Sequence, residues 1–260
     1  MPLPPLLLCT DFDGTIATPF DETQVFAPDF FEWIEKARRF YNVTWVIATG
    51  RDWPALATQL HLRHPAFWPN WVVVVERYAF AVRDYEPVSL EPWNSRCAEL
   101  HKKLFDRSSF VFEKIRAMLA DLDGLEFIVE PDSPIGMIAY SEYQADEISR
   151  ILKKVIPKNG DLMLMRNSVY FRFAHKRFHK GTGIGAIAQT LKIDPTHCFI
   201  AGDHYNDMHM LDRAYGHKLA CPGNSISEVK HLVKKQGGYI ATKSIDAGIV
   251  EALQHYFPEV

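Results

Sequence analysis

Four consecutive valines, Val72 to Val75, constrain the fold of this chain more than any other feature of the sequence. A strand with one face in water alternates apolar and polar side chains, whereas an all-apolar run indicates a strand that is buried on both faces. Other largely apolar runs of this kind lie at residues 6–10, 43–50, 197–203 and 217–222. Because helices must cover both faces of such a sheet, the pattern predicts a parallel sheet in a layered α/β domain.

Helical patterns separate several of these runs. Residues 28–41 carry apolar side chains at helical spacing, and the proline and aspartate at their start favour a helix beginning there. Further helical stretches lie at residues 181–191, 206–213 and 225–236. The alternation of strands and helices predicts a doubly wound, Rossmann-like α/β core with right-handed crossovers.

Residues 86–175 interrupt this alternation. Their patterns indicate, in chain order, a helical part at 94–122, strands at 125–130 and 135–140, a helix at 144–156, and strands at 161–166 and 169–174. This order is typical of an antiparallel sheet with helices on one side, so we interpret the stretch as a separate α+β module. We therefore predict a core domain of residues 1–85 and 176–260 and an inserted α+β domain of residues 86–175. Residues 86–92 and 174–179 are the predicted linkers.

Composition narrows the possible partners and location. The chain has 260 residues, with 47% hydrophobic and 23% charged residues and a formal net charge of −3. No long run of one charge sign suggests a nucleic-acid or membrane partner. The four cysteines are scattered, so we expect free thiols in a reducing compartment. The apolar N-terminal stretch is too short for a signal peptide, and we predict a cytoplasmic protein. Oligomeric state is not indicated.

Polar side chains follow the ends of several predicted strands, where open α/β sheets bind their ligands. The first run is followed by Asp11, Asp13, Gly14 and Thr15, the second by Thr49, Gly50, Arg51 and Asp52, and the run at 197–203 by Asp203, Asn206 and Asp207. Lys180 opens a helix directly after the inserted stretch. We expect these groups to meet at one edge of the sheet.

The chemistry of these groups is coherent. Asp11, Asp203 and Asp207 offer the hard oxygen ligands that suit Mg²⁺. Clustered carboxylates would repel one another, and a divalent cation together with Lys180 would relieve that repulsion. Thr49 and Lys180 are suited to hold a phosphoryl group.

Gly14 and Gly50 let the backbone approach such a group closely. Each motif also has an ordinary interpretation: the paired aspartates as a turn, Lys180 as a solvated lysine, and Asp203 as a helix cap. Their joint placement at strand ends favours a site.

These motifs resemble those of the haloacid dehalogenase (HAD) superfamily of hydrolases. "DFDGT" is similar to the first motif of that family, "VIATGR" to the second, "HKG" to the lysine motif, and "GDHYND" to the acidic motif. The resemblance covers about residues 5–85 and 176–255. The inserted stretch lies between the second and third motifs, and this position resembles that in the subgroup of Cof-type sugar phosphatases and sucrose-phosphatase. The resemblance therefore implies a HAD core with an inserted α+β cap domain that closes over the site.

The resemblance implies a role for each catalytic residue. Asp11 would be the nucleophile that forms an aspartyl-phosphate. Asp13 would protonate the leaving alcohol and then activate water. Thr49 would hold a phosphoryl oxygen, and Lys180 would bridge the phosphate and Asp11.

The resemblance also implies a metal site. Asp203, Asp11 and the backbone carbonyl of Asp13 would bind Mg²⁺ directly. Asp207 and Asn206 would act through waters or support the other ligands.

One departure from the family pattern concerns the end of the valine run. Relatives usually carry an Asn-Gly pair there, whereas this chain has Glu76-Arg77-Tyr78. Arg77 either contacts a substrate anion or pairs with Glu76, and the sequence leaves both open.

Gly14, Gly50, Arg51, Arg77 and Arg166 make up the set of candidate substrate-binding residues. Asn167 and Arg172 are further candidates on the inserted domain. Strand alternation alone does not tell which way Arg166 points.

The sequence thus predicts a Mg²⁺-dependent phosphatase that hydrolyses a small phosphorylated metabolite, with a sugar phosphate as the expected class. We expect no nucleic-acid or membrane partner. One alternative is a phosphomutase of the phosphomannomutase type, which would return the phosphoryl group to its substrate. Another is a non-enzymatic regulator on the same fold, although the presence of every motif residue argues against it.

Overall fold

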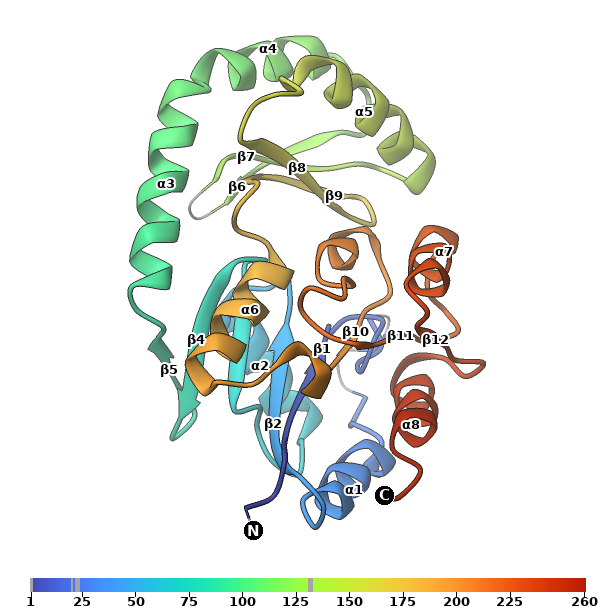
Figure 1. Cartoon of the computed structure of the whole chain (residues 1–260). Helices are drawn as coiled ribbons and strands as arrows, with labels where there is room; N and C mark the ends of the chain where they lie inside the picture. Colours follow the sequence, from blue (N-terminus) through green and yellow to red (C-terminus); the bar gives the residue numbers. More distant parts are fainter. Residues whose placement is uncertain (1, 20, 22–23, 131–132) are drawn as a thin grey trace. The chain divides into compact units, whose positions relative to one another are not determined.

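The computed structural model describes residues 2–19, 21, 24–130 and 133–260. The chain divides into two compact units (Figure 1). The first, which we call the core unit, comprises Met1–Trp93 and Lys180–Val260, and the second, the cap unit, comprises Asn94–His179. Each unit has its own sheet and its own hydrophobic core, so each is described by itself.

The core unit is built on a sheet with the strand order β12-β11-β10-β1-β2-β3-β4-β5. Its strands are β1 (Pro5–Thr10), β2 (Asn42–Ala48), β3 (Trp71–Val74), β4 (Tyr78–Arg83), β5 (Glu86–Ser89), β10 (Cys198–Ala201), β11 (Lys218–Cys221) and β12 (Tyr239–Ile240). The pairs from β12 across to β3 are parallel. The parallel sheet and the α/β class predicted from the apolar runs are therefore confirmed.

Two antiparallel strands extend this sheet beyond β3. The sequence interpretation treated residues 86–92 as a linker, but Glu86–Ser89 form β5 and pair with β4 in the core sheet. Asp84 and Tyr85 join the two strands in a tight turn with φ of +49° and +66°. Left-handed conformations at two successive residues are typical of a two-residue hairpin turn, but neither residue is the glycine that usually signals one. The hairpin was therefore not predicted.

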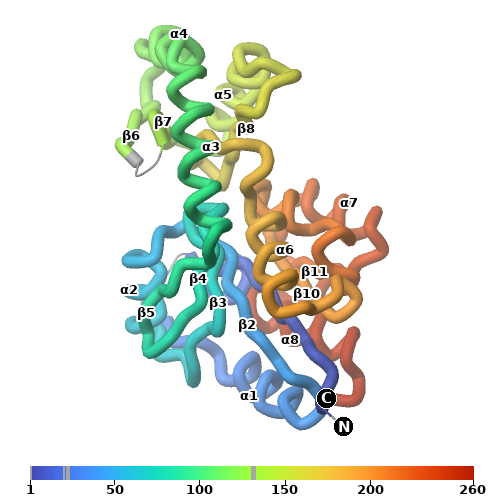
Figure 2. The backbone as a smooth tube through the Cα atoms, turned by 60° about the vertical axis from the view of Figure 1, so that its left-hand side comes forward, coloured from blue at the N-terminus to red at the C-terminus, as the bar shows by residue number. Residues whose placement is uncertain are grey.

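Helices cover both faces of the core sheet. They are α1 (Pro28–Ala37), α2 (Trp53–Arg63), α6 (Lys180–Leu191), α7 (Ser227–Lys235) and α8 (Ile245–Tyr256). One buried cluster contains residues of α1, α2 and α8, and the other contains residues of α6 and α7. The helices α1 and α8 pack side by side (Figures 1 and 2). The sequence analysis did not predict α2 or α8, and the stretch predicted as a helix at 206–213 holds only a short 3₁₀ helix, Tyr205–His209.

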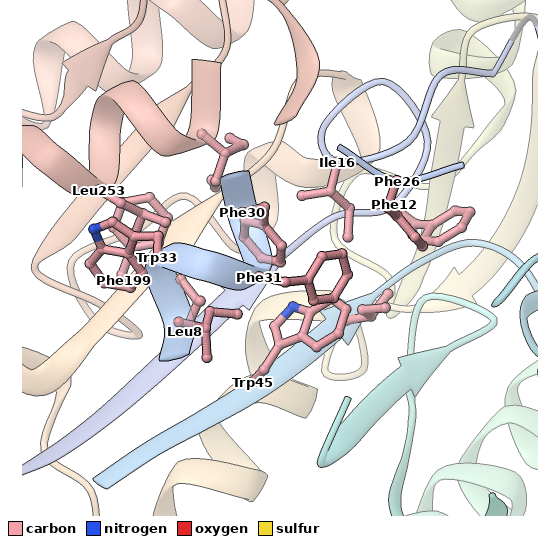
Figure 3. Packing of buried hydrophobic residues seen from close by; sticks show 14 of the residues in the cluster. Leu8, Phe12, Ile16, Phe26, Phe30, Phe31, Trp33, Trp45, Phe199 and Leu253 are labelled. Atoms are coloured by element: carbon pink, nitrogen blue, oxygen red, sulfur yellow. The ribbon is translucent and has the colours of Figure 1, made fainter. Parts of the chain in front are cut away.

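Phe12, the residue between the two aspartates of the first motif, packs into the first of these clusters. Its side chain is fully buried and meets the ring of Phe26 edge-on at a centroid distance of 6.1 Å. Figure 3 shows both rings beside Ile16 in the packed interior. Phe12 thus points into the packed interior.

The cap unit is an antiparallel sheet with helices on one face. Its elements are α3 (Trp93–Arg107, which starts at the last residue of the core segment), α4 (Ser109–Leu119), β6 (Glu126–Glu130), β7 (Ser133–Ile138), α5 (Glu142–Val155), β8 (Leu162–Asn167) and β9 (Tyr170–His175). The strand order is β6-β7-β9-β8. One buried cluster joins α4 and α5 to alternate residues of the strands.

Two further sequence expectations can be compared with the structure. All four cysteines, Cys9, Cys97, Cys198 and Cys221, are free, as predicted, and all four are buried. Among the helices in the described part of the chain, none has the length and apolar character needed to cross a membrane.

Candidate active site

The carboxyl ends of β1 and β10 bring the two acidic motifs together. The strands are paired so that Thr10 lies opposite Ala201. The backbone N–H of Asp11 donates to the carbonyl of Ala201 at 2.9 Å and extends this pairing by one residue. Asp11 and Asp203 therefore emerge from neighbouring strands at the same edge, as the strand-end rule predicts.

Lys180 is the centre of a buried ionic cluster. Its Nζ donates to Oδ1 of Asp11 and to Oδ1 of Asp207, at 2.7 Å in each case. The second oxygen of Asp207 accepts the backbone N–H groups of Asp203 and His204 at 2.8 and 3.1 Å. The Lys180 side chain is 0% exposed and that of Asp11 is 4% exposed. Lys180 thus joins residues that lie 169 and 27 positions away in the sequence.

Asp203 is oriented by the first motif. Thr15 Oγ1 donates to its Oδ1 at 2.7 Å. Gly14 has φ of +80°, and a Cβ at this residue would lie 2.4 Å from Oδ2 of Asp203. Only glycine combines that backbone conformation with that close approach. The carbonyl of Gly14 accepts a hydrogen bond from Nδ2 of Asn224 at 2.8 Å, which holds the turn against the end of β11.

Burial and mutual repulsion dominate the electrostatics of this cluster. Burial raises the pKa of Asp11 well above its usual value, and the charge of Asp207 adds to that increase. Burial also raises the pKa of Asp203, to about 7, with a further contribution from Asp207. Burial alone would lower the pKa of Lys180, but the charges of Asp11, Asp207 and Glu76 raise it well above the usual value. The positive charge of Lys180 therefore does not fully compensate the negative charge of the clustered carboxylates.

The same carboxylates could hold a metal ion. Asp11, Asp203 and Asp207 can each offer an oxygen atom, and these atoms lie within 4.8 Å of one another. An all-oxygen donor set and a deficit of positive charge fit a hard divalent cation such as Mg²⁺. Because both oxygens of Asp207 already accept hydrogen bonds, Asp11 and Asp203 are better placed as direct ligands.

Asp13 lies beside the cluster in a more open environment. Arg51 donates to both of its oxygens, through Nε and one terminal nitrogen, at 2.8 Å each. The two side chains are 25% and 22% exposed, so this pair borders solvent. Thr49, which is almost fully buried, accepts the backbone N–H of Arg51 at 3.1 Å. The second motif therefore contacts the first through Arg51.

A family model described as haloacid dehalogenase-like hydrolase matches residues 118–253, just over half of the chain. The chain belongs to the haloacid dehalogenase-like hydrolases. The matched stretch contains Lys180, Asp203 and Asp207, whereas Asp11 and Asp13 lie before it. Within the structure, the hydrogen bonds of Lys180 with Asp11 and of Thr15 with Asp203 join the first motif of this hydrolase to the matched stretch.

Solved structures share the fold of this hydrolase over nearly its whole length. Sucrose-phosphatase from Synechocystis sp. PCC6803, solved with sucrose and phosphate, has a TM-score of 0.73 at 17% identity and covers 98% of both chains. A subclass IIB sugar phosphatase of the HAD superfamily has a TM-score of 0.64 at 19% identity, covering 96% of this chain and 98% of the other. A superfamily phosphatase from Bacteroides thetaiotaomicron has a TM-score of 0.61 at 17% identity, covering 97% and 95%. At such identities the likeness establishes the fold.

Arg77 and Arg166, two of the candidate substrate-binding residues of this hydrolase, each lie among groups of their own unit. Arg77 is fully buried in the core unit, with its guanidinium 3.4 Å from the carbonyl of Val75 and 5.1 Å from the centre of the Tyr78 ring. In the cap unit, Arg166 forms ion pairs with Glu142 and Asp146 of α5. Arg77 is 0% exposed, and the side chain of Arg166 is 10% exposed.

The contacts of Arg166 settle which way β8 faces. Arg166 lies on the face that α5 covers, so its neighbour Met165 points the other way. Met165 lies opposite Arg172 in the pairing of β8 with β9, which places Arg172 on the face away from α5. Asn167 shares that face by the same alternation.

Sequence reasoning assigned three residues near the site incompletely. Asp52, grouped with the strand-end residues, caps α2 instead by accepting the N–H of Ala55 at 2.9 Å. Asn224 was overlooked although it follows a predicted strand, and the strand-end rule applied to residues 217–222 would have found it. Glu76 was noted only as a departure from the family pattern, and its position beside Lys180 has no local signal.

Proposed function

We propose that this hydrolase is a Mg²⁺-dependent phosphatase that cleaves a sugar phosphate through an aspartyl-phosphate on Asp11. The observation that carries the proposal is the buried cluster of Lys180 with Asp11 and Asp207, next to Asp203. A fully buried lysine among carboxylates costs free energy, since removing charges from water is unfavourable. The position of Lys180 at the carboxyl ends of the core strands supports a role in phosphoryl transfer.

Asp11 is suited to act as the nucleophile. Its Oδ1 accepts the hydrogen bond from Lys180, which leaves Oδ2 as the oxygen that attacks phosphorus. As the new bond between Oδ2 and phosphorus forms, the bond from phosphorus to the ester oxygen breaks. Lys180 neutralises charge on the carboxylate and on the phosphoryl group.

Asp13 is the proposed general acid and base of this reaction. It would give a proton to the leaving ester oxygen and then accept one from the water that attacks the aspartyl-phosphate. That second step breaks the bond between phosphorus and Asp11 and releases inorganic phosphate. Arg51 binds both oxygens of Asp13 and so competes with the leaving group and water for them. Opening of this pair is therefore part of the proposed cycle.

The remaining groups orient the phosphoryl group. Thr49 and the backbone at Gly14 and Gly50 are the candidate donors to its oxygens. Asp11, Asp203 and the Asp13 carbonyl are the proposed ligands of Mg²⁺, with Asp207 and Asn206 supporting them. When bound, Mg²⁺ would supply positive charge that offsets the repulsion between a dianionic substrate and the acidic edge.

The substrate class is the least constrained part of the proposal. The known structures that share this fold include a sucrose-phosphatase and a sugar phosphatase, which supports a sugar phosphate. Arg172 and Asn167, on the face of the cap sheet away from α5, are the cap side chains that we would test first for recognition of the sugar.

The test is phosphate release from a panel of sugar, polyol and nucleotide monophosphates. We expect turnover with Mg²⁺, none after chelation, and no requirement for a bisphosphate activator. The Asp11→Asn variant is the matched control for contaminating activity. A wild-type protein that releases no phosphate from any compound would refute the proposal, and a strict requirement for a bisphosphate would favour a phosphomutase.

A further inference from the structure

Glu76 lies in the loop between β3 and β4, in an unfavourable backbone conformation. Its φ is +67°, and that of the preceding Val75 is +50°. Residues other than glycine rarely adopt these values, and a β-branched valine does so least readily. Such strain persists only where the surrounding structure enforces it, and it is common at functional sites.

The backbone of this loop is fastened to the second motif. The N–H of Val75 donates to the carbonyl of Arg51 at 2.9 Å, and the N–H of Glu76 donates to the carbonyl of Thr49 at 3.0 Å. These bonds continue the parallel pairing of β2 and β3 past the strand ends. They bring Glu76 next to the Thr49–Gly50 turn.

The carboxyl group of Glu76 is buried next to Lys180. The residue is 3% exposed. Its Oε1 accepts a hydrogen bond from Nδ2 of Asn206 at 3.2 Å. Its Oε2 lies 3.8 Å from Nζ of Lys180 and has no hydrogen-bond partner among the described residues. A buried carboxylate oxygen without a hydrogen bond is costly, so its position here needs a reason.

Gly50 leaves room for this carboxyl group. A Cβ at residue 50 would lie 2.6 Å from Oε1 of Glu76, closer than nonbonded atoms approach. Glu76 therefore fills the space that the missing side chain of Gly50 leaves. It contacts the second motif, the lysine motif and, through Asn206, the acidic motif.

We propose that Glu76 is a positioning residue for phosphoryl transfer: it holds Lys180 and the Thr49–Gly50 turn in register with Asp11. The inference rests on the proposed phosphatase function. An ammonium group has three protons, and Asp11 and Asp207 accept two of them. The charge of Glu76 on a third side keeps the lysine from moving away when the charge on Asp11 changes during the reaction.

The first test compares Glu76→Gln with wild type. Glutamine keeps the shape of the side chain and an acceptor for Asn206 but removes the charge beside Lys180. We expect thermal unfolding close to that of wild type, with kcat lowered by about 10- to 100-fold, as is usual when a group supporting an active site is lost. The loss should be equal for substrates with good and poor leaving groups, because Lys180 acts on the phosphoryl group. Glu86→Gln, an exposed glutamate on β5, is the matched control and should change neither quantity.

A second measurement does not depend on turnover. Titration calorimetry of inorganic phosphate with Mg²⁺ present should show affinity about 10-fold or more weaker for Glu76→Gln than for wild type. Equal phosphate affinity together with unchanged kcat would overturn the inference, as would a lower melting temperature with normal kcat in the folded fraction. A wild-type protein that binds phosphate but releases none would refute the proposed function alone, since the titration would still decide the role of Glu76.

A pair of variants tests the packing that underlies the proposal. Gly50→Ala should lower the melting temperature in the wild-type background, where the new methyl group meets Oε1 of Glu76. The same substitution made in a Glu76→Ala protein should lower it much less. An equal decrease in both backgrounds would contradict the assigned contact between Gly50 and Glu76.

Discussion

Lys180 in the core unit and Lys102 in the cap unit both pair with aspartate, but their surroundings differ completely. The Lys180 side chain is 0% exposed, whereas that of Lys102, which pairs with Asp106 one helical turn away, is 77% exposed. An exposed pair costs little to form and contributes little to stability. A buried pair must compensate for the loss of hydration, and apolar side chains of similar size would often serve the fold as well.

The contrast belongs to particular clusters, since the core unit also has an exposed ion pair between Arg38 and Glu35 and the Arg166 side chain of the cap unit is only 10% exposed. Other ion pairs of the cap unit, such as Arg107 with Asp161, also border solvent. The core unit instead places Asp11, Asp207 and Glu76 around one buried lysine. Under the proposed function, burial separates the charges that would take part in the reaction from charges that lie on a solvated surface.

The largest effect should come from Asp11→Asn. An amide cannot attack phosphorus as a carboxylate does, so we expect the loss of activity to be on the order of 10⁴-fold or more. Phosphate release and circular dichroism should be measured on the same preparation. Substantial steady-state turnover by the folded variant would exclude Asp11 as the nucleophile. It would also show that the buried charges of the core unit are not needed for the reaction.

Asp13→Ala should have the next largest effect. Loss of a positioned acid and base should lower kcat by about 10²- to 10⁴-fold on a sugar phosphate. A nitrophenyl phosphate should lose less, because its leaving group needs no proton. The ratio of the two losses is the measurement, and equal losses would argue against proton transfer by Asp13.

The third prediction compares stability in the two units directly. Lys180→Met leaves Asp11 and Asp207 buried without their partner and should lower the free energy of unfolding by about 3–5 kcal/mol. Lys102→Met, on the exposed surface of α3, should change it by no more than about 0.5 kcal/mol. Urea denaturation of both variants gives the comparison. Similar changes in the free energy of unfolding for the two variants would show that the buried carboxylates do not depend on Lys180 for their stability.

A further effect should appear in the pH dependence of stability without metal. The pKa of Asp203 in the folded chain is raised from 3.8 to about 7. Between these values the folded state holds a proton that the unfolded state has released, so this contribution to stability decreases as pH rises from about 4 to 7.

The comparison that isolates this contribution uses Asp203→Asn. In chelator, the melting temperature of wild type should fall more steeply than that of the variant over this pH range. Added Mg²⁺ should stabilise wild type more at pH 8 than at pH 5.5, because protons compete with the metal for the carboxylates. Parallel pH curves for wild type and Asp203→Asn would contradict the assigned shift.

Sequence patterns located most elements of both sheets, and they failed at the β4–β5 hairpin for an identifiable reason. A turn with two left-handed residues usually contains glycine or asparagine, whereas Asp84 and Tyr85 adopt it here because the strands on either side pair. The antiparallel strands of the cap unit were found because each is a segment of ordinary length that is rich in apolar residues. Apolar patterns in the sequence therefore located those strands whose residues are mostly buried.

By itself, the sequence determined the parallel α/β core, the inserted α+β segment and the positions of Asp11, Lys180 and Asp203 at element ends. These follow from apolar runs and from the residues that end them, which are local properties of the chain. Only the tertiary structure decided that Arg51 holds Asp13, that Arg166 faces α5, and that Glu76 lies beside Lys180. Each of these contacts joins segments far apart in the sequence, and its geometry depends on how strands and helices pack. Hydrogen bonds and ion pairs act over a few ångströms, so chain order cannot specify them until packing has brought the segments together.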